Sequence, residues 1–101
     1  MPIGFKMGQA EGSYLARDYR RAIEVYDSVI GIPWYAKLMR SLSLAQLGDV
    51  DTARKSAAAA IAEAPSTIDI ADLARNVAAM CALPDDAEHW LDGFRKAGVE
   101  V

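Results

Sequence analysis

The sequence contains one cysteine, Cys81, and one histidine, His89. A single cysteine cannot form an internal disulfide, and a histidine without a second cysteine or histidine at ligand spacing does not make a zinc site. We therefore expect no metal ligands, no cofactor and a reducing, cytoplasmic setting. The sequence also lacks a glycine-rich phosphate loop and a Gly-x-Ser-x-Gly elbow. Because no nucleophile, base and orienting group can be assembled from its residues, we expect no enzyme activity.

Long apolar runs and excess positive charge are missing as well. The longest apolar stretch, residues 57–62, is far shorter than the roughly 20 residues that a helix needs to span a bilayer. The first residues, MPIGFKMGQAEGS, lack the apolar stretch of a signal peptide. A formal net charge of −3 gives no electrostatic footprint for nucleic acid. These absences predict a protein that contacts neither membrane nor nucleic acid.

The chain is rich in apolar residues at helical spacing. Hydrophobic residues make up 52% of it, and Ala22, Val25, Tyr26 and Val29 follow one another at three- and four-residue intervals. Glycine, proline and capping residues separate such segments, which predicts six helices joined by short turns. The expected helices cover residues 5–16, 19–30, 34–47, 50–64, 67–82 and 85–97. Short turns force neighbouring helices to pack antiparallel, as helical hairpins.

The hairpins repeat. Ala22, Ala53 and Ala87 each follow a turn by four or five residues, and the interval between them is about 30–35 residues, the length of a helical-hairpin repeat. A small residue at a helix crossing lets the two helix axes approach closely. The predicted units therefore span about 3–33, 34–65 and 66–98, in one domain over residues 1–101.

The middle unit resembles a tetratricopeptide repeat. Its stretch LAQLGDVD, residues 44–51, is similar to the end of the family's first helix and the turn after it, and Ala53, Ala60 and Pro65 match the small, small and proline positions. The first unit has Arg17 where glycine is usual, and the third has a different turn, Leu83-Pro84. The resemblance implies an all-α fold of three stacked antiparallel helical hairpins. The closing segment WLDGFRKAGVEV also resembles the end of tetratricopeptide domains that follow class III adenylate cyclase domains in some bacterial proteins.

The resemblance further implies a protein–protein interaction module, which binds a partner peptide or helix in a concave groove formed by the first helix of each hairpin. The family's pattern places in that groove Tyr35, Leu38, Leu42 and Gln46 from the middle unit, Asp69, Asp72, Asn76 and Met80 from the third, and Met7, Glu11 and Tyr14 from the first. Family members that clamp a terminal carboxylate use lysine, arginine and asparagine, and this lining is instead apolar and acidic. We therefore expect an apolar or basic ligand segment.

Two of these assignments have a structural alternative. Asp69 and Asp72 fall in the first turn of a predicted helix, where carboxylates cap the helix and offset its dipole. Leu38 and Leu42 form an apolar stripe of the kind more often found in a core. A second apolar set on the same helix, which includes Met39 and Leu47, suits the hairpin interior, so we expect the stripe to be partly exposed in the groove.

The last predicted helix supports a second functional hypothesis. Trp90, Leu91 and Phe94 lie on a helix with no following repeat to cover it, and large exposed apolar patches usually mark contact sites. The alternative to a peptide-binding module is therefore a self-associating structural or regulatory module, a homodimer formed through these residues.

Overall fold

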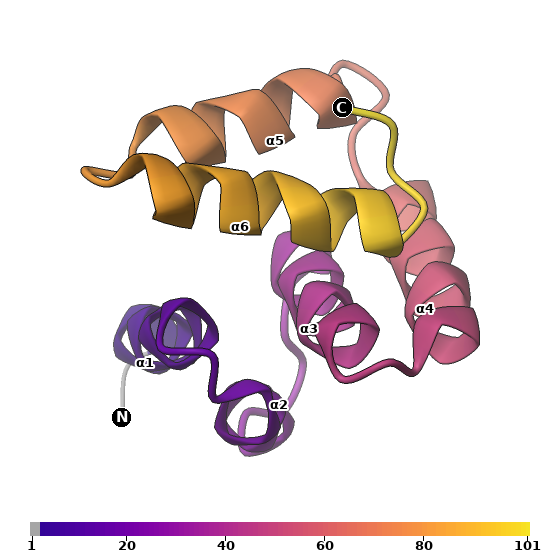
Figure 1. The fold of residues 1–101 in the computed structure, drawn as a ribbon. Coiled ribbons are helices and arrows are strands. Elements are labelled where there is room, and N and C mark those ends of the chain that lie inside the picture. Colours follow the sequence, from indigo (N-terminus) through magenta and orange to yellow (C-terminus); the bar gives the residue numbers. More distant parts are fainter. Residues whose placement is uncertain (1–2) are drawn as a thin grey trace.

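The computed structural model describes residues 3–101, all of whose regular structure is helical (Figure 1). The helices are α1 (Ile3–Leu15), α2 (Tyr19–Asp27), α3 (Trp34–Gln46), α4 (Val50–Glu63), α5 (Ile70–Ala79) and α6 (Pro84–Lys96). The predicted all-α fold of six helices in hairpins is confirmed. The predicted domain starts at residue 1, and residues 1 and 2 lie outside the described part of the chain. No helix in the described part is long and apolar enough to cross a membrane.

The first two hairpins close through the same turn geometry. After α3, the Asp49 amide donates to the Leu44 carbonyl oxygen (3.1 Å), and after α1 the Asp18 amide donates to the Ser13 carbonyl oxygen (2.9 Å). This bond pattern requires a left-handed residue just past the helix end, where glycine is usual. Gly48 fills that position after α3 with φ 94°, whereas Arg17 fills it after α1 with φ 65°. Arg17 therefore has a left-handed backbone conformation, which is less favourable for arginine than for glycine.

Side chains decide two helix boundaries that differ from the predicted ones. The helix α2 ends at Asp27 and not at residue 30, because the Ser28 hydroxyl donates to the Val25 carbonyl oxygen (2.6 Å) and Gly31 then adopts φ 70°. The helix α5 begins at Ile70 and not at residue 67, because the Asp69 carboxylate accepts a hydrogen bond from the Asp72 amide (3.1 Å). The capping alternative for Asp69 is therefore confirmed.

The third hairpin lies across the first two. Figure 1 shows α1 and α2 viewed nearly end-on and α3 and α4 obliquely, with α5 and α6 running crosswise above α1, α2 and α3. It is the second helix of this hairpin, α6, that packs against α3, while α5 packs chiefly on α6. The helix α3 therefore contacts helices of all three hairpins and forms the centre of the core.

Gly93 permits this crossing. A Cβ atom at Gly93 would collide with the Tyr14 hydroxyl of α1 and lie 3.2 Å from Leu42 Cγ of α3. The missing side chain thus lets the α6 backbone approach both helices closely. The next residue, Phe94, is fully buried at the same junction.

The predicted self-association surface on α6 is wrong. Phe94 has no exposed surface, Trp90 is 4% exposed and Leu91 is only half-buried. The prediction assumed that the last helix stays at the outer end of a regular stack, with one face in water. Because α6 instead lies against α3, its large apolar residues belong to the core of this chain.

Candidate functional site

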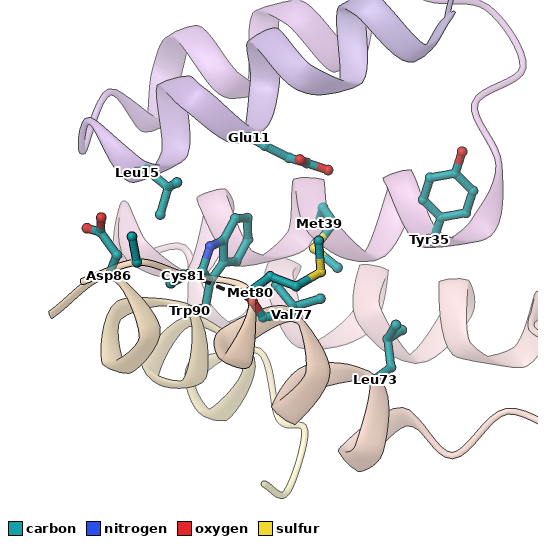
Figure 2. Close-up of a pocket in the computed structure, with 11 residues that line it drawn as sticks. Glu11, Leu15, Tyr35, Met39, Leu73, Val77, Met80, Cys81, Asp86 and Trp90 are labelled. Atoms are coloured by element: carbon teal, nitrogen blue, oxygen red, sulfur yellow. Dashed lines mark hydrogen bonds between the residues drawn. The ribbon is translucent and has the colours of Figure 1, made fainter. Parts of the chain in front are cut away.

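An apolar cleft of about 480 Å³ lies where α1, α3, α5 and α6 meet. Figure 2 shows its lining side chains converging from these helices and from the α5–α6 turn. The lining consists of Glu11, Leu15, Tyr35, Met39, Leu73, Val77, Met80, Cys81, Ala82, Asp86 and Trp90. Ligand-binding clefts are typically of this size and mostly apolar.

Each of the four helices contributes a pair of residues spaced by four. The pairs are Glu11 and Leu15 on α1, Tyr35 and Met39 on α3, Leu73 and Val77 on α5, and Asp86 and Trp90 on α6. Residues four apart lie one above the other on one face of a helix. Each helix therefore turns a single face toward the cleft, and its other faces remain available for the core.

The cleft has a buried base and an exposed apolar rim. Trp90 is 4% exposed and Met39 is 8% exposed, so both lie at the base. Tyr35 is 44% exposed and Met80, the C-cap residue after α5, is 85% exposed, so both lie at the rim. Because these exposed apolar side chains adjoin an apolar cavity, cavity and rim together form a candidate contact site.

The polar groups of the cleft include two carboxylates, a thiol and the Tyr35 hydroxyl. Asp86 forms an ion pair with Arg17 (3.3 Å between Oδ1 and Nη1). Burial raises the pKa of the Glu11 carboxyl. The Cys81 thiol donates to the Val77 carbonyl oxygen (3.7 Å; dashed in Figure 2). Burial, with the Asp86 carboxylate, raises the pKa of this thiol, so it stays protonated at neutral pH and is a poor nucleophile.

An aromatic cluster behind the cleft attaches α6 to the first hairpin. The Tyr14 ring of α1 stacks on His89 (ring centroids 4.3 Å apart) and on Trp90 (4.2 Å), and its hydroxyl donates to the His89 carbonyl oxygen (2.9 Å). The Tyr19 hydroxyl of α2 lies 2.7 Å from His89 Nε2. Burial raises the pKa of Tyr14, so the hydroxyl remains a donor throughout the ordinary pH range.

Gln46, a predicted groove residue, belongs to the polar edge of this cluster. Its Nε2 donates to the Tyr14 hydroxyl and to Asp92 Oδ2 (both 3.2 Å), and its Oε1 accepts from Lys96 Nζ (2.9 Å). Lys96 also forms an ion pair with Asp92 (2.9 Å), and its hydrogen bond lowers the pKa of that carboxyl. Gln46 therefore joins α3 to α6 and does not line the cleft.

The prediction that Leu38 and Leu42 line the groove is wrong. Both are fully buried, because α6 crosses the face of α3 on which they lie, and the Gly93 backbone packs against Leu42. Tyr35, on the same stripe, remains partly exposed and lines the cleft. The stripe is thus core along most of its length, and its first residue alone meets solvent.

The predicted residues of α5 divide in the same way. Met80 lines the cleft, whereas Asp69, Asp72 and Asn76 are exposed outside its lining. Asp69 caps α5, and Asp72 forms an ion pair with Arg75 on the same helix. Both carboxylates interact within or next to α5, in agreement with the alternative role at the start of a helix that the sequence analysis named for them.

Sequence reasoning missed most of the apolar wall. Leu15, Met39, Leu73 and Val77 line the cleft but were not predicted as site residues, and Trp90 was predicted for a different surface. The signal available was the spacing of four within each helix. On its own that spacing also describes a core face, so it becomes informative only once the four helices are placed.

Comparisons of the chain with protein families, with curated proteins and with solved structures found no match. Within residues 3–101, no group of three or more histidine, cysteine, aspartate or glutamate side chains is arranged to hold a metal ion. The candidate site is therefore defined by the geometry and chemistry of the cleft itself.

Proposed function

We propose that the chain is a protein-interaction module of the tetratricopeptide type, which binds an apolar segment of a partner protein in the cleft between α1, α3, α5 and α6. The observation that carries the proposal is the apolar cleft with its exposed rim of Tyr35 and Met80. Burying apolar surface is favourable by about 25 cal/mol per Å². Methionine side chains adapt their shape to different partners, which suits Met80 and Met39 to such a site.

The family assignment is supported by the first two hairpins. Their turns have the short, left-handed form expected after the first helix of a repeat, and Ala22 and Ala53 are fully buried where helices meet. The crosswise third hairpin departs from a regular stack, so the proposed binding surface is the cleft beside α6 and not a groove along three first helices. The proposed role is binding in the cytoplasm, without catalysis.

The test compares exposed apolar residues inside and outside the cleft. Met80→Lys and Tyr35→Lys place a charge at the rim, and Ile30→Lys is the matched control, because Ile30 is fully exposed and does not line the cleft. Partners captured from cell extract by the wild type are identified, purified and titrated against each variant by calorimetry. We expect each rim variant to weaken binding about tenfold or more, and the control to bind like the wild type.

Circular dichroism establishes that the three variants remain folded, since surface changes alter stability by about 0.5 kcal/mol or less. The proposal fails if the rim variants bind the purified partners as tightly as the control does.

A further inference from the structure

The charged side chains of the cleft all carry one sign. Glu11 comes from α1 and Asp86 from α6, and among the side chains that the structure describes no lysine, arginine or histidine lines the cavity. Figure 2 shows the Glu11 side chain extending from α1 toward the space above Met39, near the middle of the cleft, while Asp86 lies at one end beside Cys81. A ligand that fills the apolar interior therefore meets the negative charge of Glu11, whereas the charge of Asp86 is partly balanced by its ion pair with Arg17.

The two carboxylates differ in what they already contact. Asp86 is paired with Arg17, so part of its charge is compensated within the chain. Glu11 makes no hydrogen bond or ion pair with any side chain in residues 3–101, and burial raises the pKa of its carboxyl. The Glu11 side chain is exposed to solvent at the edge of the cleft, so a cation on a ligand that lies in the cleft can reach its carboxylate.

We infer that the cleft is selective for a polypeptide segment with a lysine or arginine next to bulky apolar residues, whose cation pairs with Glu11 while the apolar side chains lie among Met39, Leu73 and Val77. This inference rests on the proposed function and names the chemistry of its partner. Charge complementarity of this kind sets specificity more than affinity.

A polypeptide fits the surroundings of the cleft better than a small free amine does. The exposed apolar surface of Met80 and Tyr35 continues past the cavity, and Leu83, in the turn after Met80, is 61% exposed. A small ligand inside the cavity would leave this rim in water. A chain segment covers cavity and rim together, with several side chains in contact.

The first experiment selects ligands without assuming a partner. Short random peptides displayed on phage are panned against the immobilised wild type, with the Met80→Lys variant as the counter-selection that removes binders outside the cleft. We expect the enriched peptides to combine bulky apolar residues with a nearby lysine or arginine. Enrichment of apolar peptides with no basic preference would overturn this inference and leave the proposed function standing. Failure to enrich any peptide that depends on Met80 would overturn both.

The second experiment tests the role of Glu11 on the most enriched peptide. Glu11→Gln keeps the shape and removes the charge, and Glu100→Gln is the control, an exposed glutamate that does not line the cleft. We expect Glu11→Gln to weaken binding about tenfold by calorimetry and the control to leave it unchanged. The wild-type affinity should fall with added salt, and this dependence should be smaller in Glu11→Gln. Equal affinity of Glu11→Gln and wild type would refute the pairing with Glu11.

Discussion

His89 of α6 is the single histidine of the sequence, and its ring stacks on Tyr14 of α1. Its Nε2 contacts the Tyr19 hydroxyl, and its Nδ1 is buried without a hydrogen-bond partner among the described residues. Burial lowers the pKa of His89 from 6.5, and the positive charge of Arg17 acts in the same direction. The nearby Asp92 and Asp86 carboxylates oppose this shift without cancelling it, and Lys96 adds to it.

We predict that the free energy of unfolding decreases as the pH falls below about 6.5. The pKa of His89 is lower in the folded chain than in the unfolded one, so the unfolded chain takes up the proton first. The contribution is complete above the unfolded pKa and is lost as the pH falls through the folded pKa. For one proton the slope cannot exceed about 1.4 kcal/mol per pH unit.

Urea unfolding of wild type and His89→Gln over a pH series measures this contribution. The difference between the two curves isolates His89 from carboxylates that titrate at lower pH. The wild type should lose stability more steeply than His89→Gln between about pH 5 and 7. Parallel curves would mean that the proton binds equally well in both states.

At the scale of the helix, α6 is the element whose position creates the cleft. It contributes Trp90 to the base and Asp86 to one end, and it is held by Gly93 against α3 and by Tyr14 against α1. The glycine is unfavourable for the helix itself, because glycine is about 0.8–1.0 kcal/mol less favourable than alanine in a helix interior. Its advantage is that α6 can pack closely against α1 and α3 at this position.

We predict that Gly93→Ala destabilises the fold by about 1–3 kcal/mol, in spite of the better helix propensity of alanine. The added methyl group would collide with the Tyr14 hydroxyl and crowd Leu42 Cγ. The matched control is Gly12→Ala on α1, where an added Cβ meets nothing within 4 Å. That variant should gain about 0.8–1.0 kcal/mol. Thermal and urea unfolding give both values, and a stabilised Gly93→Ala would show that α6 does not cross α3 at this glycine.

At the scale of the whole molecule, core and cleft share their walls. Trp90 and Met39 belong to the hydrophobic core and also form the base of the cleft. We therefore expect a change in the core at α6 to alter the shape of the cleft, and a change at the exposed rim to leave the core intact. The two kinds of residue are separated by burial, with Phe94 fully buried and Met80 85% exposed.

We predict that Phe94→Ala lowers the free energy of unfolding by about 3–5 kcal/mol, the usual range for a buried phenylalanine. The total stability of a small domain is about 5–15 kcal/mol, so the variant should be close to unfolding. Met80→Lys should change stability by about 0.5 kcal/mol or less. Urea unfolding followed by circular dichroism measures both. If the Phe94→Ala variant is as stable as Met80→Lys, then Phe94 is not buried, and α6 has the solvent-exposed position that the sequence suggested.

Local interactions made the helices and turns readable from the sequence. The Gly48 turn and the apolar spacing around Val25 depend on residues within a few positions of one another, and both appear in the structure as expected. The last helix begins at Pro84, one residue before the predicted start at 85. The same locality explains the acidic first turn and basic last turn of α6. By itself the sequence therefore determined an all-helical chain of hairpins and the chemistry available to it, an apolar and acidic set of side chains.

Only the tertiary structure decided which faces are core and which face is the cleft. A stripe such as Tyr35, Leu38 and Leu42 has the same spacing whether it is covered or exposed, and the helix that covers it comes from a distant part of the chain. Gly93 against Leu42 and Tyr14 is a contact between three helices, and no local pattern on α6 specifies it. The docking of α6 buried Leu38, Leu42 and Phe94 and left Tyr35 and Met80 in solvent, because burial depends on contacts between residues far apart in sequence.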